Sequence, residues 1–260
     1  MKVGKQMKIA VFDTETVNTV KPFCYNVGVV IYDTEQEKTL LKREWVIKDI
    51  WYNKPLFATA YYAEKRPIYI KRMRARKIKL VTYRECCKEL LSIFNQYEVQ
   101  FAYAYNSPFD DGVFKFNCEW FKVVNSFDNL PILDIATLVH HKIAFTSDYQ
   151  NFCDKYELYT ETGNYSTTAE NVYRYITNQI DFIEEHTALN DSEIELEILL
   201  YCIKNGCEFG KEYKKYSSIP RIKELKFIDK RNGKDKIKEY IFKNCKRIRI
   251  SKDKTQITIS

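Results

Sequence analysis

The sequence predicts an α/β protein in which helices flank one mixed β-sheet whose first three strands form a meander. Two observations lead to this prediction. Three strand-like apolar segments follow one another near the N-terminus, and strand-like segments then alternate with helical ones up to about residue 205. Apolar residues make up 45% of the 260 residues and only 7 are glycine, so the chain has enough apolar side chains for a core and is not of the disordered class.

The meander is predicted from three segments rich in β-branched and aromatic side chains, residues 8–12, 25–32 and 40–47. A polar turn at 33–38 joins the second strand to the third. A helix is expected at 83–97, because Thr82 is a suitable N-cap and Glu85 occupies the capping-box position.

The alternating part is expected to contain a strand, a helix, a second strand and three helices at 99–105, 108–124, 130–135, 147–156, 167–185 and 191–204. Residues 1–205 are therefore predicted to form one domain. The composition then shifts to Lys, Tyr and Ile, so 206–260 is interpreted as a basic C-terminal extension. Its end, KRIRISKDKTQITIS, alternates polar and apolar residues around a short turn and predicts a β-hairpin.

Positive charge is concentrated in this extension. Residues 221–254 contain 14 Lys or Arg and 5 Asp or Glu, a net charge of 14 − 5 = +9, whereas the whole chain carries +7. The rest of the chain therefore carries 7 − 9 = −2. Either a phosphate-rich partner or a merely soluble lysine-rich surface explains this distribution.

Targeting signals and metal-binding cysteine pairs are absent from the sequence. The N-terminus is too polar for a signal peptide and no segment approaches the length of a membrane span, which predicts no membrane partner. The 8 cysteines are scattered without a C-x-x-C pair, so we expect reduced thiols. A cytoplasmic location is expected, or the host cytoplasm if the chain is viral.

Two carboxylates stand one residue apart in the segment VFDTET, where Asp13 and Glu15 follow an apolar run. In a strand, alternate side chains point to the same face, so these two acids lie side by side and repel each other. Either the strand has ended and the acids are solvated, or a divalent cation with oxygen ligands lies between them.

Partner carboxylates occur in two later segments. YAYNSPFDDGVF places Asp110 where a helix begins after a strand, and EEHTALNDSEIEL places His186 five residues before Asp191, just before another helix. Each acid alone could be a helix N-cap, and the histidine alone could be a surface residue.

Taken together and in this order, Asp-x-Glu, N-x-x-F-D and H-x-A-x-x-D resemble the motifs of the DEDD (DnaQ-like) 3′–5′ exonuclease superfamily, in its DEDDh branch. The resemblance covers about residues 7–205 and does not extend to 65–79 or past 206. It implies an RNase H-like sheet and two divalent cations, Mg²⁺ or Mn²⁺. These cations would bind the scissile phosphate of a nucleic acid strand.

The resemblance also implies roles for five residues. Asp13 would bridge both cations, Glu15 and Asp191 would complete the site on the side of the attacking water, and Asp110 would hold the other cation, partly through water. His186 would be the general base, since imidazole titrates near neutral pH. The spacing N-x-x-F-D selects Asp110 rather than its neighbour Asp111.

Substrate contacts are expected around these residues. Thr14 and Thr16 would place main-chain groups near the terminal nucleotide, Asn106 would position the turn before the helix, and Phe109 would be buried behind the catalytic aspartate. These roles too follow from the resemblance.

The basic run KRPIYIKRMRARKIK at 65–79 has two interpretations. It could follow the backbone of a single strand, with Arg72 and Arg74 among the contacts, or it could be a solvated amphipathic helix. The preceding aromatic residues Phe57, Tyr61 and Tyr62 are expected in the core rather than at a stacking platform.

The function expected from the resemblance is hydrolysis of single-stranded 3′ ends to nucleoside 5′-monophosphates, with DNA favoured as substrate. An RNA-trimming exonuclease of the same chemistry is an alternative, because no sequence feature decides whether a 2′-hydroxyl is accepted. A non-catalytic nucleic-acid-binding or docking module on the same fold is another. Since the chain has no polymerase-like region, proofreading would require a polymerase or other replication protein as partner.

Overall fold

The computed structural model describes residues 7–216, 240–242, 245–250 and 257–259. The chain forms two compact units, one of Met1–Phe152 with Thr167–Lys215 and the other of Cys153–Ser166 with Tyr216–Ser260. Every residue proposed above for a site lies in the first unit.

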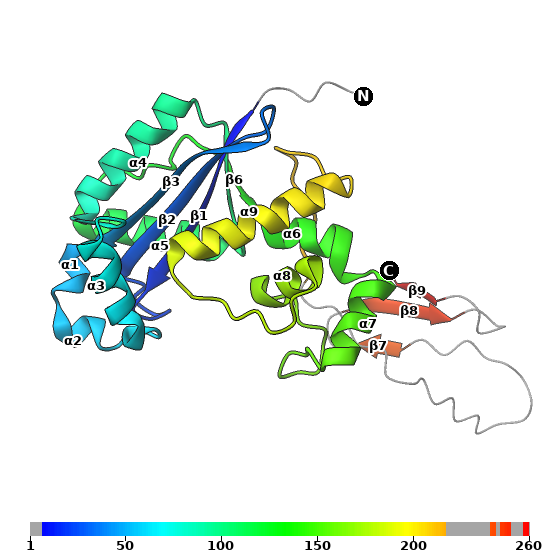
Figure 1. The fold of residues 1–260 in the computed structure, drawn as a ribbon. Coiled ribbons are helices and arrows are strands. Elements are labelled where there is room, and N and C mark those ends of the chain that lie inside the picture. Colours follow the sequence, from blue (N-terminus) through cyan, green and yellow to red (C-terminus); the bar gives the residue numbers. More distant parts are fainter. Residues whose placement is uncertain (1–6, 217–239, 243–244, 251–256, 260) are drawn as a thin grey trace, which may run out of the picture. The chain divides into compact units, whose positions relative to one another are not determined.

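A six-stranded mixed sheet forms the centre of the first unit, in the order β4-β3-β2-β1-β5-β6 (Figure 1). Its strands are β1 (Lys8–Thr16), β2 (Cys24–Asp33), β3 (Lys38–Ile47), β4 (Lys79–Val81), β5 (Phe101–Ala104) and β6 (Ile132–Asp134). The first three are antiparallel neighbours, β5 and β6 run parallel to β1, and β4 runs parallel to β3. This is the predicted RNase H-like arrangement, with the meander confirmed and the short strand β4 added at its edge.

Strand β1 is longer than expected, and its length rules out the alternative in which the strand ends before Asp13 and Glu15. Pairing with β2 continues from Lys8 opposite Asp33 to Thr16 opposite Cys24. Asp13 and Glu15 therefore lie within the strand and not in a solvated loop after it, and the Glu15 side chain is buried.

Helices cover both faces of the sheet. Helices α4 (Tyr83–Tyr97) and α5 (Ser107–Phe121) contribute to an apolar core in which Phe12 of β1 packs on Phe114 and Phe127. The expected capping box begins α4, since Thr82 N–H donates to Glu85 Oε2 over 2.7 Å and Thr82 Oγ1 accepts from Glu85 N–H. Helix α9 (Ala188–Lys204) crosses the other face (Figure 1).

The remaining helices of the chain are short. They are α1 (Lys48–Trp51), α2 (Lys54–Phe57), η1 (Ala63–Lys65), α3 (Arg66–Arg74), α6 (Ile135–Val139), the π-helical turn η2 (His140–Ala144), α7 (Ser147–Tyr156) and α8 (Ala169–Thr177). Helix α8 ends earlier than the expected 167–185, because Asn178 adopts a left-handed conformation with φ of 55°. An irregular segment thus leads into α9.

In the second unit, β7 (Tyr240–Phe242), β8 (Cys245–Ile250) and β9 (Ile257–Ile259) form an antiparallel sheet, and Ile250 lies opposite Ile257. The tip of the expected hairpin and all of the basic residues between 221 and 239 lie outside the described residues. Six cysteines of the described residues are buried free thiols, at positions 24, 86, 87, 118, 202 and 207. No helix of this described part is both long and apolar enough to cross a membrane.

Candidate active site

Asp13 and Glu15 point to the face of the sheet that carries α9. Their partners across β2 are Gly28 and Asn26, and residues paired in this way share a face. A Cβ added at Gly28 would lie 2.2 Å from the main-chain carbonyl carbon of Ala188, the first residue of α9. Glycine at this position therefore allows the start of α9 to lie directly beside Asp13.

The start of α9 is also held by a buried amide. Thr187 is the N-cap residue but makes no side-chain capping bond. Instead, Asn26 Oδ1 accepts from the main-chain N–H of Ala188 over 2.9 Å and from the Tyr69 hydroxyl over 3.0 Å. Asn26 Nδ2 in turn donates to the carbonyl oxygen of Trp45 over 2.9 Å, so the helix start is tied to the sheet.

Asp191 lies in the first turn of α9, and the close approach of this helix to the sheet brings Asp191 to Asp13 and Glu15 of β1. Carboxylate oxygens of Asp13, Glu15 and Asp191 lie within 4.8 Å of one another. Asp191 is only 7% exposed, and its buried Oδ1 has no hydrogen-bond partner among the described residues. Such an unpartnered carboxylate oxygen in a group of acids is suited to a cation.

Asp110 joins the group from the first turn of α5. It accepts hydrogen bonds from the main-chain N–H of Thr14 over 3.1 Å and from the Thr14 hydroxyl over 2.6 Å. Its charge has a larger effect on the pKa of Asp13 than that of any other neighbour. The adjacent Asp111 instead pairs with Lys115 one turn further along the helix, so the structure brings Asp110 to the cluster.

Burial and the charges of neighbouring acids raise the pKa of these four carboxyl groups. Burial is the largest cause in each case, and the pKa rises to about 8 for Glu15, to about 7 for Asp110 and to about 9 for Asp191. The pKa of Asp13 is also raised well above its usual range, by burial and then by the neighbouring acids. Four ionised carboxylates are therefore unfavourable here without positive charge.

Glu195 is a fifth buried acid that sequence reasoning missed. It lies one turn after Asp191, is 4% exposed, and accepts a hydrogen bond from the main-chain N–H of Tyr105 over 3.1 Å. After Asp110, its charge is the next largest contributor to the raised pKa of Asp13. The four-residue spacing from Asp191, which places both acids on one face of α9, was a signal that could have indicated it.

His186 lies in the irregular segment before α9, beside the carboxylates. Its Nδ1 lies 3.5 Å from Glu184 Oε2, and these two residues with Asp191 form a second group whose ligand atoms lie within 4.8 Å of one another. Burial, and then the charge of Lys65, lower the pKa of His186. Burial raises the pKa of Glu184 to about 7. The imidazole is therefore neutral near pH 7.

The aromatic residues before the basic run do not all belong to the core. Phe57 is buried as expected, but Tyr61 is 77% exposed, so this part of the expectation is wrong. Tyr62 stacks on the His186 ring, with ring centroids 4.4 Å apart and an interplanar angle of 10°. Sequence alone gave no sign of this contact, since the two residues come from distant segments.

Phe109 is not buried as expected. It lies one residue before the buried Asp110 on α5 and is 37% exposed. On a helix that turns 100° per residue, a neighbour of an inward-pointing side chain faces a different direction. The expectation that Phe109 packs behind the aspartate is therefore wrong, and its ring is available at the surface.

The other two residues expected near the terminal nucleotide lie at ends of elements. Thr16 is the last residue of β1. Asn106 precedes α5 in a left-handed conformation with φ of 61°, and its N–H donates to Asp134 Oδ1 over 2.9 Å. Its side-chain oxygen accepts from Lys215 Nζ over 2.7 Å, so Asn106 is part of the turn that starts α5.

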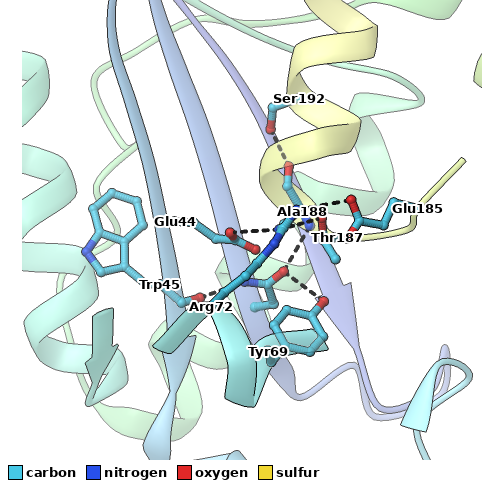
Figure 2. A network of polar contacts seen from close by, with 9 residues as sticks. Glu44, Trp45, Tyr69, Arg72, Glu185, Thr187, Ala188 and Ser192 are labelled. Carbon is cyan, nitrogen blue, oxygen red and sulfur yellow. Dashed lines mark hydrogen bonds and ion pairs between the residues drawn. The ribbon is translucent and has the colours of Figure 1, made fainter. Parts of the chain in front are cut away.

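The two arginines proposed from the basic run differ in their surroundings. Arg74 is exposed at the end of α3. Arg72 forms ion pairs with Glu44 and Glu185 over 3.2 and 3.0 Å, and donates to Thr187 Oγ1 over 3.1 Å (Figure 2). The structure thus places Arg72 in a network that joins α3, β3 and the segment before α9.

Comparison with solved structures finds the exonuclease I of Escherichia coli in complex with a dA16 oligonucleotide, at 16% identity and a TM-score of 0.48, covering 75% of this chain and 41% of that chain. The same enzyme with a dT13 oligonucleotide aligns at 15% identity and a TM-score of 0.45, covering 77% of this chain and 41% of that chain. This chain therefore matches less than half of that protein's length. No protein-family model matches the sequence, and no curated protein matches it. The candidate site is defined by the buried carboxylates on an RNase H-like sheet.

Proposed function

We propose that the protein is a metal-dependent 3′–5′ exonuclease that releases nucleoside 5′-monophosphates from single-stranded nucleic acid, with DNA favoured. One observation carries the proposal: the carboxylates of Asp13, Glu15, Asp110 and Asp191 converge from β1, α5 and α9, three of them buried and that of Asp13 half-buried, with His186 beside them. A cluster with this much negative charge does not stabilise an apolar core, and its acids match the motifs identified in the sequence.

The donor set fits divalent cations. All four acids offer hard oxygen ligands of the kind that Mg²⁺ and Mn²⁺ prefer, and one Asp191 oxygen is buried without a partner among the described residues. Asp13, Glu15 and Asp191 would hold one cation, and Asp13 with Asp110 a second. When bound, two such cations supply positive charge at the scissile phosphate and lower the pKa of an attacking water.

The chain's own groups then perform three tasks. Thr14 fixes Asp110 through two hydrogen bonds, which keeps its carboxylate directed at the cluster. His186 accepts the proton of the water whose oxygen forms the new bond to phosphorus, while the bond to the 3′ oxygen of the preceding nucleotide breaks. Glu184, 3.5 Å from Nδ1, favours the tautomer with the proton on Nδ1 and leaves Nε2 as the acceptor.

Substrate contacts are proposed for the exposed groups near this centre. The Phe109 ring is at the surface next to Asp110 and offers a stacking surface for a terminal base. Main-chain groups of Thr14 and Thr16, and the turn at Asn106, lie at the ends of the elements that carry the acids. The exposed Arg74 is available for a phosphate.

The partner that this function requires is a single-stranded 3′ end, and the +9 charge of residues 221–254 supports a phosphate-rich partner. Docking of this extension on a polymerase or other replication protein is a second proposal for the same charge. Both apply to a segment that lies largely outside the described residues.

The decisive test uses single-stranded DNA and RNA oligonucleotides labelled at the 3′ or 5′ end, each with Mg²⁺, Mn²⁺ or EDTA. The proposal expects a ladder of 5′-labelled products shortened from the 3′ end, mononucleotide release from the 3′ label, and no reaction in EDTA. Faster hydrolysis of RNA would assign the RNA-trimming alternative. Binding without hydrolysis under every metal condition would reject the enzyme and favour the non-catalytic module.

A further inference from the structure

The segment from Tyr62 to Arg72 lies mostly in the part of the chain, residues 65–79, to which the family resemblance does not extend. It contacts the histidine-bearing segment at consecutive residues. Lys65 Nζ donates to the main-chain carbonyl of Glu185, and Tyr62 stacks on His186. Arg72 contacts Glu185 and Thr187, the two neighbours of the histidine (Figure 2). Each of the residues 185–187 is therefore held by a side chain from this segment.

His186 needs such support because of its backbone. Its φ is 51°, in the left-handed region that residues other than glycine rarely adopt. The segment between α8 and α9 carries no helix or strand to fix this conformation. Tertiary contacts must then determine where the imidazole lies relative to Asp191.

Among these side chains, Arg72 also binds a residue of the central sheet. Its guanidinium bridges Glu185 and Thr187 on one side and Glu44 of β3 on the other, at 3.0, 3.1 and 3.2 Å. Glu44 is only 2% exposed, so the arginine is fixed to the sheet itself. Two carboxylates share this one guanidinium, which leaves no net positive charge for a phosphate.

We infer that Arg72 is a positioning residue for the general base: it fixes both neighbours of His186 to the central sheet and does not bind the substrate. The inference rests on the proposed function, since it assigns a reason for holding His186. It also separates Arg72 from the exposed Arg74, with which it was grouped in the sequence.

The kinetic test compares Arg72→Met, Arg72→Lys and Lys71→Met in the full chain. Small displacements of a catalytic group cost large factors in rate, so Arg72→Met should lower kcat about 10- to 100-fold with KM for an oligonucleotide changed less than about threefold. Arg72→Lys should recover only part of kcat, because an ammonium cannot bridge three partners as a planar fork does. Lys71→Met removes one exposed positive charge from the same helix and should leave kcat within about twofold of wild type.

A structural measurement tests the same inference without turnover. The chain has 3 histidines, so ¹³C-labelled histidine gives few ring signals, and His186→Asn assigns one of them. Stacking on Tyr62 should shift the His186 ring protons upfield, and Arg72→Met should move them toward the position of an unstacked histidine. The signals of His140 and His141 should remain in place.

Arg72→Met leaves Glu44 without its partner, so a second variant is needed in case this one does not fold. Thr187→Val keeps the shape of a fully buried side chain and removes only one hydrogen bond to the arginine. It should lower kcat about 3- to 10-fold and shift the His186 signal in the same direction.

Two outcomes would overturn the inference. A rise in KM at unchanged kcat in Arg72→Met would make the arginine a substrate contact, and an unchanged His186 signal together with unchanged kcat would remove its positioning role. If the wild-type protein hydrolyses no more substrate than the Asp13→Ala variant, which is expected to be inactive, the proposed function fails. The His186 signal still reports in that case whether Arg72 holds the segment.

Discussion

Two groups of acids near the start of α9 differ in how their charge is balanced. Glu44 and Glu185 share the guanidinium of Arg72 at 3.2 and 3.0 Å. Asp13, Glu15, Asp110 and Asp191 form no ion pair with a basic side chain among the described residues, and Lys65 beside them donates to a main-chain carbonyl. We call these the paired group and the unpaired group.

The pKa values of Glu44 and Asp191 illustrate this difference. Burial is the first cause of both, but for Glu44 the neighbouring Arg72 opposes it, and its pKa rises to about 7. For Asp191 the charges of Glu184 and Glu15 add to burial ahead of the opposing charge of Lys65, and its pKa rises to about 9. A paired group of acids stabilises the fold by itself, whereas an unpaired one requires a cation from outside. Charge balance thus distinguishes a structural network from a candidate metal site.

The largest expected effect is loss of hydrolysis in the unpaired group. Asp13→Ala should reduce kcat by at least about 10³-fold by removing a ligand from both proposed cations. Titration calorimetry with Mn²⁺ should show weaker binding or none, while circular dichroism should show a folded protein. Near-wild-type turnover of this variant at saturating Mg²⁺ would contradict the two-cation proposal.

Replacement of the proposed general base, His186, should have the next largest effect. His186→Ala should lower kcat by about 10²–10⁴-fold and leave oligonucleotide binding nearly unchanged. Because burial lowers the pKa of His186, the wild-type rate should rise with pH up to the neutral range and then level off. His141→Ala removes an exposed histidine and is the matched control. Poor binding with normal turnover in His186→Ala would instead make the histidine a substrate contact.

The Gly28→Ala substitution, which adds one methyl group, tests the close approach of α9 to the sheet. In Gly28→Ala the new Cβ would lie 2.2 Å from main-chain carbon of Ala188, so the helix start must shift, at a cost of about 1–3 kcal/mol. Mn²⁺ affinity should fall as Asp191 moves away from Asp13. Gly112→Ala is the control, because a Cβ there would meet nothing within 4 Å. It lies within α5 and should stabilise the protein by about 0.5–1 kcal/mol. Equal Mn²⁺ affinity in both variants would show that this close approach does not position the site.

Much of this site could be predicted from local patterns. Strand alternation placed Asp13 and Glu15 on one face, and the motif spacing selected Asp110, which the structure brings to Thr14. The capping box at Thr82 was likewise visible, because its partners are three residues apart.

The residues that sequence reasoning missed depend on contacts between distant segments. Asn26 and Ala188, for example, are 162 positions apart, and neither residue type signals the hydrogen bond between them. Arg72 was grouped with Arg74 by charge alone, although only the fold brings it to Glu44 and Glu185. Strand β4 was missed because three residues are too few to show a period, and the Phe109 ring was misplaced because its helix turns between neighbours.

The smallest expected effects concern stability, and they compare the two groups directly. In EDTA, the unpaired carboxyl groups have higher pKa values in the folded protein than the value of about 4 in an unfolded chain. The folded state therefore binds more protons between these values, so its stability is full below about pH 4 and falls as pH rises through 7 to 9. Mg²⁺ or Mn²⁺ should restore it, and more so at pH 8 than at pH 5.

Two single substitutions then separate the groups at pH 8 in EDTA. Asp191→Asn removes a group that must take up a proton on folding at pH 8, since its pKa is about 9 in the folded protein and about 4 in the unfolded chain. It should therefore raise Tm, by about 2–4 °C for each kcal/mol gained. Glu44→Gln removes a partner of the half-buried Arg72 and should lower Tm by a similar amount. At pH 5 the gain in Asp191→Asn should be much smaller, because this pH is close to the pKa of an unfolded aspartate and protonating Asp191 on folding then costs little. Equal shifts of Tm with the same sign in both variants would show that the two groups do not differ in charge balance. Charge balance would then no longer support a cation site at the unpaired group.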